Sequence, residues 1–492
     1  MFAPKQSMTC KVEHIVERLK RMPMVTVVVP FAIGIFIAES LVIPIWSALL
    51  LLAVALAGGL WLRGAMRNVV LLVAVAAAGV ALHTARCRDD IDYDKRQMLR
   101  LRFEESSLVR NGRSRTAARI VKAESASLEG CRIVAWSDST RCFSAGDCAS
   151  ARTTVRRFNP KYESYARLMH YRGFAGSASI GEVEEFVPSR RKRLHEVAVE
   201  RLSTILEADK AGAVVLAMTT GSRASITPEL RQAYSRSGTS HILAVSGMHV
   251  GILFLLINAL IYPLAILQHG NIIKSVVAVA AIWSFVALCG LPPSAVRAAV
   301  MFSALQLSLH IPGRYSSGNI WAATAFAMLL CDSNLLFDIS FQLSFIAVAG
   351  IIFWGVPLYN ALRSSYRPLN ALTASLVVGV VSSAVTMPLI AHTFGIVSII
   401  GVVLNPLVIL SAYIILLFGI TSLAIVPLAE VAHLAARLQN GVVEWAASHE
   451  SFYIDGSLTG WQVALIYGLY AATTVAIWSI GGKKRVHIDD NL

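Results

Sequence analysis

Residues 238–253 have the sequence GTSHILAVSGMHVGIL, and this stretch decides how the rest of the chain is interpreted. Its apolar residues are those of a membrane span, but His241, Ser246 and His249 carry polar groups that need a partner, water or a cavity at membrane depth. An unbroken helix would separate the two histidines by about 12 Å. We therefore predict a helix break at Ser246-Gly247, which a membrane tolerates only where the freed backbone groups face protein or a water-filled path.

A simpler interpretation stays open for this stretch. In it the helix is continuous, its Ser and Gly pack against a neighbouring helix, and its histidines lie near the lipid headgroups. The sixteen residues do not choose between this packed helix and the wall of a pore or binding site.

The composition indicates a polytopic α-helical membrane protein. Of 492 residues, 55% are hydrophobic and 15% are charged, which does not fit a large soluble core. The formal charge of +14 is concentrated in residues 100–193, which hold 19 Lys and Arg against 10 Asp and Glu. This excess suits an anionic partner, although basic residues beside a membrane also set orientation or bind headgroups.

Hydropathy, charge and turn residues divide the chain into six expected segments. They are a cytoplasmic N-terminus (1–23), three transmembrane helices (24–85), an extracytoplasmic small β-barrel domain (86–190), amphipathic interfacial helices (191–237), a transmembrane channel domain (238–480) and a short cytoplasmic tail (481–492). A signal peptide does not fit the N-terminal span, because a second span follows almost at once.

The channel domain should contain several further spans. We expect them near 272–290, 294–311, 319–331 and 339–357, with two or three more between 371 and 427 and a last one at 460–480. Placing the basic tail inside requires 396–427 to cross twice or to re-enter. Asn405-Pro406 would supply the necessary break.

The end of the barrel segment, FNPKYESYARLMHYRGFAG (158–176), alternates aromatic and basic residues. Such side chains stack bases and hold phosphates, although the same spacing also suits the core of a capping helix. The candidate DNA-binding residues are Arg156, Arg157, Lys161, Tyr162, Tyr165 and Arg167.

Several spans carry polar groups beside helix breakers, a pattern that favours a hydrated conduit over an anchor. Arg297 follows Pro292-Pro293 and should face a cavity, a carboxylate such as Asp338, or the outer surface by snorkelling. Pro388 should kink its span. The residues expected to line the path are His241, Ser246, Gly247, His249, Arg297, Asp338, Gln342, Ser344, Pro388 and Asn405.

The cysteines do not indicate a metal site. The chain has seven, without CxxC or Cys/His metal spacing, so we expect neither a metal nor a cofactor. One disulfide is plausible among Cys131, Cys142 and Cys148 if that segment is extracytoplasmic, with the pairing open.

Four stretches resemble, in order, the signature blocks of ComEC-type competence channel proteins. Block 1 is 238–253, and the others are LCGLPPSAVRAAVM (block 2, 288–301), FDISFQLSFIAVAGI (block 3, 337–351) and PLIAHTFGIVSIIGVVLNPLVI (block 4, 388–409). The resemblance implies uptake of single-stranded DNA across the cytoplasmic membrane in natural transformation, with the OB-like domain contacting the strand outside.

The resemblance also implies partners. These are single-stranded DNA, membrane lipid, an extracytoplasmic DNA receptor, a cytoplasmic translocase ATPase and a separate nuclease, while a homo-oligomer stays open. Only GGKKRVHIDDNL follows the last span and no HxHxDH cluster occurs, so the metallo-β-lactamase-like domain of longer members should be missing. We therefore expect no enzyme activity. The alternatives are a transporter or flippase of another anionic substrate, and an intramembrane serine hydrolase using Ser246.

Overall fold

The computed structural model describes residues 22–480, apart from 42, 87–90, 92, 111, 190–192, 268, 311–315 and 399. Most of the expected N-terminal segment, the basic run at 190–192 and the expected cytoplasmic tail lie outside the described residues. Contacts divide the chain into two units. We call Pro30–Val197 with Met328–Gln342 the barrel unit, and Met1–Val29, Ala198–Ala327 and Leu343–Leu492 the helical unit.

The described residues include seven helical stretches that are long and apolar enough to cross a membrane. They lie in α2 (Pro23–Ser40), α4 (Gly64–Arg86), α10 (Gly270–Leu288), α13 to α14 (Ile339–Leu362), α15 (Arg367–Phe394), α16 (Gly401–Thr421) and α18 (Gly460–Ile480). Shorter apolar helices are α3 (Ile45–Trp61), α7 (Lys210–Thr220), α9 (Gly247–Leu260) and α12 (Ser317–Cys331). The prediction of a multi-pass α-helical membrane protein is confirmed.

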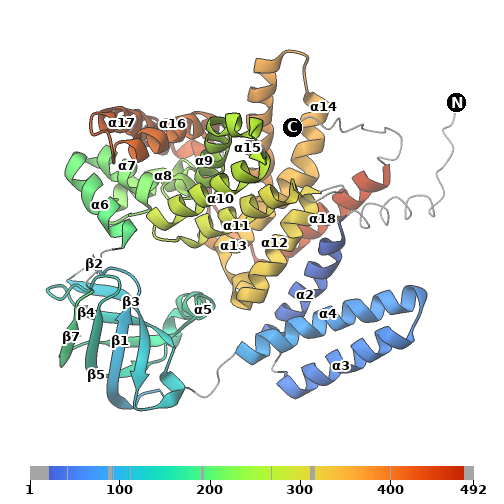
Figure 1. Cartoon of the computed structure of the whole chain (residues 1–492), viewed down its shortest axis with the longest axis horizontal. Helices are drawn as coiled ribbons and strands as arrows, with labels where there is room; N and C mark the ends of the chain where they lie inside the picture. Colours follow the sequence, from blue (N-terminus) through green and yellow to red (C-terminus); the bar gives the residue numbers. More distant parts are fainter. Residues whose placement is uncertain are drawn as a thin grey trace. The chain divides into compact units, whose positions relative to one another are not determined.

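In the barrel unit, small residues let two helices of the first membrane segment touch through their backbones. A Cβ atom on Gly34 of α2 would lie 2.0 Å from the Ala76 carbonyl oxygen of α4, and one on Gly79 would lie 2.4 Å from the Phe31 oxygen. Membrane helices associate through such close packing because lipid offers no hydrophobic drive between them. Helices α3 and α4 form an antiparallel hairpin (Figure 1).

Five strands of the described chain close into a barrel in the order β1-β3-β4-β6-β5, with β5 pairing back to β1. Strands β4 and β6 are parallel, and the other pairs around the ring are antiparallel. The strands are β1 (Arg96–Phe103), β3 (Arg113–Ala123), β4 (Arg132–Asp138), β5 (Cys148–Arg156) and β6 (Phe174–Ser179), while β2 (Leu108–Arg110) and β7 (Glu185–Val187) extend β3 and β5. This is the expected OB-like barrel.

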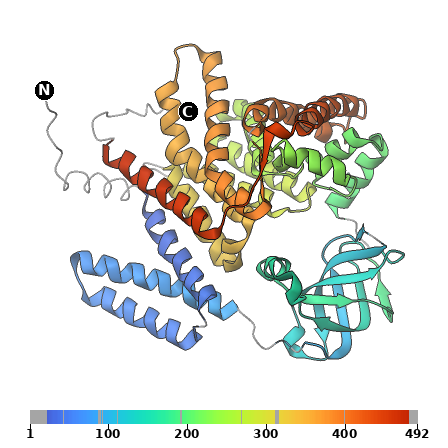
Figure 2. The same cartoon turned by 180° about the vertical axis from the view of Figure 1, so that it is seen from behind.

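The barrel core follows from period-two patterning. Leu99, Leu101 and Phe103 of β1 are buried while the residues between them face outward, and Ile120 and Ile133 fill the core from β3 and β4. Helix α5 (Glu163–Tyr171) lies beside the barrel in both views (Figures 1 and 2).

The structure records no disulfide among the described residues, and a pairing among the three candidate cysteines stays a prediction. Each of the three candidate thiols points at a local carbonyl oxygen: Cys131 at Ser127, Cys142 at Ser139 and Cys148 at Gly146. Cys131 is buried in the barrel core, where it packs as a small apolar side chain.

The helical unit is built around α7, which contradicts the expectation that 191–237 forms only amphipathic interfacial helices. Every residue of α7 from Ala211 to Thr220 is buried, and α7 packs against α16 and α17 (Leu428–Ala447). Helix α6 (Leu194–Ile205) buries only Ala198 and Leu202. Thr227 caps α8 (Pro228–Arg236) by accepting the Leu230 N–H at 3.3 Å, as predicted.

Helix α17 has no counterpart among the expected elements. It is held by a buried chain in which Tyr234 Oη donates to Asn440 Oδ1 at 2.8 Å and accepts from Gln439 Nε2 at 2.9 Å. Ser411 Oγ of α16 donates to Gln439 Oε1 at 2.6 Å. Such buried networks specify how helices pack, although Asn440 Nδ2 has no hydrogen-bond partner among the described residues.

One expectation about the last spans needs correction. Asn405 and Pro406 do not break a helix, because α16 runs without interruption from Gly401 to Thr421. Pro406 lies in its second turn. The interruption comes earlier, where β8 (Ile396–Ser398) pairs with β9 (Tyr453–Asp455). Between 371 and 427 the described chain therefore has two long helices, α15 and α16.

We predict that Glu104 stabilises the barrel in a pH-dependent way. Its carboxylate accepts from Arg119 at 2.8 Å and Arg132 at 2.7 Å. Burial raises the pKa of this carboxyl, but the two arginines outweigh burial and hold the pKa below its ordinary 4.5. The contribution to stability is therefore complete above pH 4.5 and is lost as the pH falls toward the lowered pKa.

Replacing Glu104 by Gln should cost of the order of 1 kcal/mol at neutral pH and little in acid. Hydrogen exchange of β3 and β4 amides, measured from pH 7 to 3.5 on the full chain, tests this. Equal protection of parent and variant at pH 7 would contradict it. Glu105→Gln, at an exposed position beside Glu104, is the matched control.

Candidate functional site

The chain breaks in block 1 where the sequence predicted. Ser240–Ile242 form a short 3₁₀ turn, and α9 begins at Gly247 with Ser246 as its N-cap. The Ser246 backbone N–H donates to His249 Nδ1 at 3.1 Å, and Ser246 Oγ lies 3.0 Å from the same nitrogen. Because Nδ1 must accept the backbone N–H, the neutral imidazole carries its proton on Nε2.

His249 keeps an unsatisfied donor in the core of the helical unit. Its side chain is fully buried, and Nε2 has no hydrogen-bond partner among the described residues. A buried polar atom without a partner costs about 1–3 kcal/mol unless water or a ligand satisfies it. His241, in contrast, is exposed on the 3₁₀ turn.

Block 2 packs directly on this break. Helix α11 (Pro293–Ser308) begins with Pro293, and Ser294 Oγ donates to the Val245 carbonyl oxygen at 2.5 Å. The turn before it holds Leu291 at a φ of 57°, a strained value for a residue with a Cβ. A backbone carbonyl freed by the break in block 1 is therefore satisfied by a side chain of block 2.

Arg297 lies one turn into α11 and has 2% of its surface exposed. This burial contradicts the alternative in which the side chain snorkels to the outer surface. Its neighbour Ala298 contacts Gly247, where an added Cβ would lie 3.5 Å from the Ala298 Cβ. Helix α9, which Ser246 caps and which carries Gly247 and His249, thus packs against α11, which carries Arg297.

Block 4 reaches the other end of block 1. Gly238 has a φ of 75°, and a Cβ there would lie 2.8 Å from the Ser398 Cβ, so the two chains touch where only glycine fits. A Cβ on Gly401 would lie 3.1 Å from the Ser237 oxygen. Ser398 Oγ and Asn405 Oδ1 are buried without a hydrogen-bond partner in the described part of the chain.

The polar residues of block 3 are engaged locally. Asp338 accepts the Phe341 N–H at 3.0 Å, as a cap of α13, and Gln342 Nε2 donates to the Leu336 oxygen at 2.8 Å. Asp338 and Arg297 belong to different units, so their pairing stays a prediction. Ser344 is partly buried in α13. Sequence reasoning missed the π-helical turn Ile351–Gly355, a feature frequent at functional sites.

Pro388 has a defined structural consequence. Lacking an N–H, it frees the Ala384 carbonyl one turn earlier in α15. The Tyr470 hydroxyl of α18 donates to that oxygen at 3.1 Å, and Tyr467 donates to the next one, Val385, at 2.9 Å. Nothing local in the sequence identifies Tyr470, because it lies 82 positions after Pro388.

The candidate residues of the soluble domain are mostly exposed. Tyr162 is 67% and Tyr165 is 37% exposed at the start of α5, while Arg157 lies over the Tyr93 ring at 4.6 Å. These tyrosines are therefore not the core of a capping helix; Met169 takes that place. Arg156 and Lys161 are exposed, and Arg167 pairs with Glu163.

Tyr171, at the end of α5, contacts block 3 within the barrel unit. Its ring stacks on Phe337 at 5.0 Å, and its hydroxyl donates to Glu39 of α2 at 3.1 Å. The other oxygen of Glu39 lies 3.0 Å from His83 Nε2. Burial and the Glu39 charge raise the pKa of Tyr171 to about 12, so its hydroxyl stays protonated. Helix α5 is thus held next to Asp338, the residue that follows Phe337.

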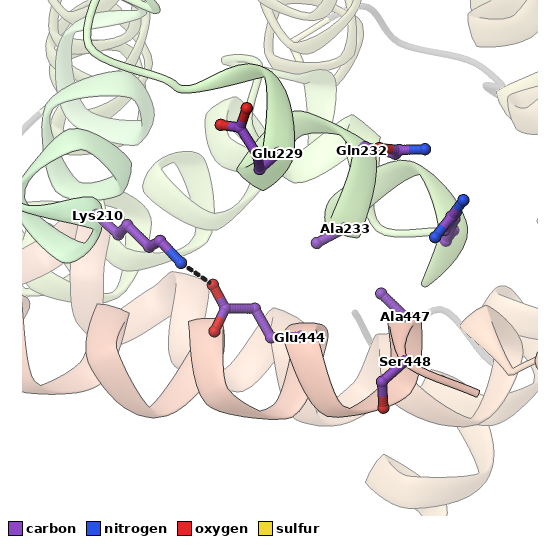
Figure 3. Close-up of a pocket in the computed structure, with 8 residues that line it drawn as sticks. Lys210, Glu229, Gln232, Ala233, Glu444, Ala447 and Ser448 are labelled. Carbon is purple, nitrogen blue, oxygen red and sulfur yellow. Dashed lines mark hydrogen bonds and ion pairs between the residues drawn. The ribbon is translucent and has the colours of Figure 1, made fainter.

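A surface pocket of about 260 Å³ lies elsewhere in the helical unit. Lys210 and Glu444 point toward one another across it, at 2.8 Å, and Glu229 and Gln232 come from α8 (Figure 3). Two carboxylates balance Lys210 and Arg236, so the pocket has no net charge to attract an anion. It contains none of the predicted site residues.

Among the described residues, Glu207, Asp209 and His433 place potential metal-ligand atoms within 4.8 Å of one another. Asp209 Oδ1 already caps α7, accepting the Gly212 N–H at 2.7 Å, and lies 2.9 Å from His433 Nε2. Hydrogen bonds thus account for this cluster without an ion.

Comparison with known proteins places the blocks in a defined family region. A family model described as "Competence protein" matches residues 218–480. The chain is 29% identical to "ComE operon protein 3" of Bacillus subtilis (strain 168) over 254 residues, which are 50% of this chain and 31% of that protein. It is 32% identical to "Uncharacterized protein YcaI" of Escherichia coli (strain K12) over 160 residues, 31% of this chain and 21% of that protein.

A further relative is an uncharacterized protein of Aquifex aeolicus (strain VF5), 28% identical over 253 residues that cover 50% of this chain and 55% of the relative. The aligned parts therefore span between about a fifth and about half of the length of these relatives. No solved structure matches the chain.

We predict that Tyr470 and Pro388 are energetically coupled. Tyr470→Phe leaves the Ala384 oxygen unsatisfied and should cost about 1–3 kcal/mol. In a Pro388→Ala background the new N–H at 388 can bond to that oxygen, so the same substitution should cost less. A double-mutant cycle by unfolding in detergent micelles measures the difference. Tyr467→Phe is the control, and equal costs of Tyr470→Phe in both backgrounds would refute the coupling.

Proposed function

Since this chain belongs to the competence protein family, we propose that it conducts single-stranded DNA across the cytoplasmic membrane in natural transformation. Its multi-pass character follows from its long apolar helices. The DNA substrate, the cytoplasmic membrane and the transport path are parts of the proposal. So is the assignment of 238–480 as the channel domain and of 86–190 as an extracytoplasmic domain.

The observation that carries the proposal is the set of unsatisfied polar atoms in blocks 1 and 4. His249 Nε2, Ser398 Oγ and Asn405 Oδ1 are buried without partners in the described part of the chain, and all three belong to blocks 1 and 4. A DNA strand cannot cross hydrocarbon with uncompensated phosphates, so it needs water, donors and cations along its way. Arg297, on α11, which packs against the α9 helix of His249, supplies a buried cation.

The barrel has a role upstream in this proposal. Tyr162 and Tyr165 present exposed rings beside exposed Arg156 and Lys161, the combination by which OB-type domains hold single strands. Helix α5, which carries Tyr165, is held against Phe337, the first residue of block 3. A strand bound to α5 is therefore held next to Asp338 and Gln342, two of the proposed lining residues.

The proposal requires other proteins. A receptor outside must deliver DNA, an ATPase inside must pull the strand, and a separate nuclease must degrade the other strand. A homo-oligomeric channel is compatible with it. The rival class is a transporter or flippase of another anionic substrate; lipid flipping by reconstituted protein without DNA would favour that rival.

One observation favours a hydrolase as a second candidate, namely the 3.0 Å between Ser246 Oγ and His249 Nδ1. A nucleophile and its base need this contact. However, Nδ1 also accepts the Ser246 backbone N–H, so a reciprocal helix cap accounts for the pair. We predict no labelling of Ser246 by a fluorophosphonate; labelling that Ser246→Ala abolishes would revive the hydrolase.

We predict that His249→Gln impairs uptake without unfolding the protein. Glutamine at this position can still cap Ser246, but it removes the imidazole Nε2–H from the buried site. In a competent host lacking the native gene, we expect about a tenfold or larger loss of transformants, about 1.4 kcal/mol in the barrier to strand movement. We expect a loss of transformants of the same size for Arg297→Ala.

The controls separate channel function from folding. Membrane levels of both variants should match the parent, DNA binding at the cell surface should persist, and Gln232→Ala in the neutral surface pocket should transform normally. Parental transformation by both His249→Gln and Arg297→Ala would overturn the assigned path. Unaltered transformation after deletion of the whole gene would overturn the function.

A further inference from the structure

The outer surface of the barrel carries a basic patch that the sequence did not reveal. Strands β3, β1 and β5 are neighbours, and their outward positions hold six exposed cations. We call these the basic face: Arg96, Arg100 and Arg102 of β1, Lys122 of β3, and Arg152 and Arg156 of β5.

The register brings like charges together. Arg100 is directly opposite Lys122 on one side and Ser150 on the other, and Arg102 is opposite Arg119. Successive outward residues of one strand are about 7 Å apart and neighbouring strands about 5 Å apart, so the cations form a continuous array. Like charges directly opposite each other destabilise a sheet. The face therefore costs stability in the absence of an anion.

Nearby carboxylates do not neutralise the array. Within the described residues, none of the six side chains forms an ion pair or hydrogen bond. Glu104 is engaged by Arg119 and Arg132. At the rim, Glu124 accepts the Met98 N–H, Glu129 accepts the Ala123 N–H, and Glu185 accepts from the Ser150 hydroxyl. Three rim carboxylates against six cations leave the face positive.

The chemistry of the face differs from that of α5. On β1 and β5, the other outward residues of the basic face include Met98, Ser150 and Thr154, and no aromatic ring lies among them. Bases therefore have nothing to stack on. On these three strands Val121 is the exposed large apolar side chain, and Phe186 and Val187 of β7 are exposed at the edge beside β5. This is too little to insert into a lipid surface, which basic membrane-binding elements achieve with an apolar face.

The geometry points to the basic face as a second nucleic-acid surface, which binds the phosphodiester backbone of DNA without reading or stacking bases. Such contacts do not depend on unpaired bases, so the face binds duplex DNA as well as a single strand. It complements α5, whose exposed tyrosines require unstacked bases. The inference rests on the proposed uptake of DNA and extends it, because it makes this chain a binder of the duplex before strand separation.

The test uses the full chain in nanodiscs of zwitterionic lipid, with labelled duplex and single-stranded DNA and anisotropy at several salt concentrations. The variant is Arg96→Gln with Arg100→Gln and Arg152→Gln, and the matched control replaces the same three residues by Lys. We expect the Gln variant to lose at least about tenfold in affinity for both DNAs. The slope of log K against log salt should fall in magnitude by about 3 for duplex and about 2 for single strands.

The Lys control should bind like the parent, and the Gln variant should be at least as thermostable as the parent because repulsion is relieved. Tyr162→Ala with Tyr165→Ala should weaken single-strand binding more than duplex binding. Unchanged duplex affinity in the Gln variant would overturn the inference, as would equal loss in the Lys control. Loss of binding to anionic vesicles alone would identify a lipid surface instead. All these outcomes are independent of the transformation assay, which tests the channel.

Discussion

A chain that interrupts a helix at membrane depth must give each freed backbone N–H and C=O group another partner, because lipid supplies none. This protein meets the requirement with groups from elsewhere in the chain. Ser294 donates to the carbonyl freed before α9, and Tyr470 donates to the carbonyl freed by Pro388. Strand β8 satisfies its backbone by pairing with β9. The interruptions are thus held by tertiary contacts.

Satisfying the backbone leaves side chains to define the chemistry of the site. The contacts that satisfy the backbone groups also surround His249 and Asn405, where His249 Nε2 and Asn405 Oδ1 are buried without a hydrogen-bond partner among the described residues. In a core evolved only for stability such atoms are costly, because apolar residues of similar size would pack there without loss. In the proposed function, the atoms of blocks 1 and 4 are the ones that a hydrated substrate would use, while others, such as Thr219 Oγ1 and Asn440 Nδ2, lie outside the blocks.

The barrel separates two kinds of DNA chemistry. Period-two alternation sends apolar residues inward, and the outward positions of three neighbouring strands collect cations without aromatic rings. The aromatic rings occur instead on α5, beside the barrel, where Tyr171 is anchored to Phe337. In the proposed function, phosphate contact and base stacking are therefore tasks of different surfaces of one small domain.

Hydropathy was sufficient to predict a membrane protein and the positions of most helices, since a span needs only about twenty apolar residues in a row. Local sequence patterns were sufficient to predict the break at Ser246 and the cap at Thr227. Contacts between distant segments could not be predicted from the sequence. The role of Tyr470, the burial of α7, the amphipathic helix α17 and the error at Asn405-Pro406 all depend on which segments pack together. The basic face depends on strand register, because cations far apart in the chain become neighbours only when β1, β3 and β5 pair.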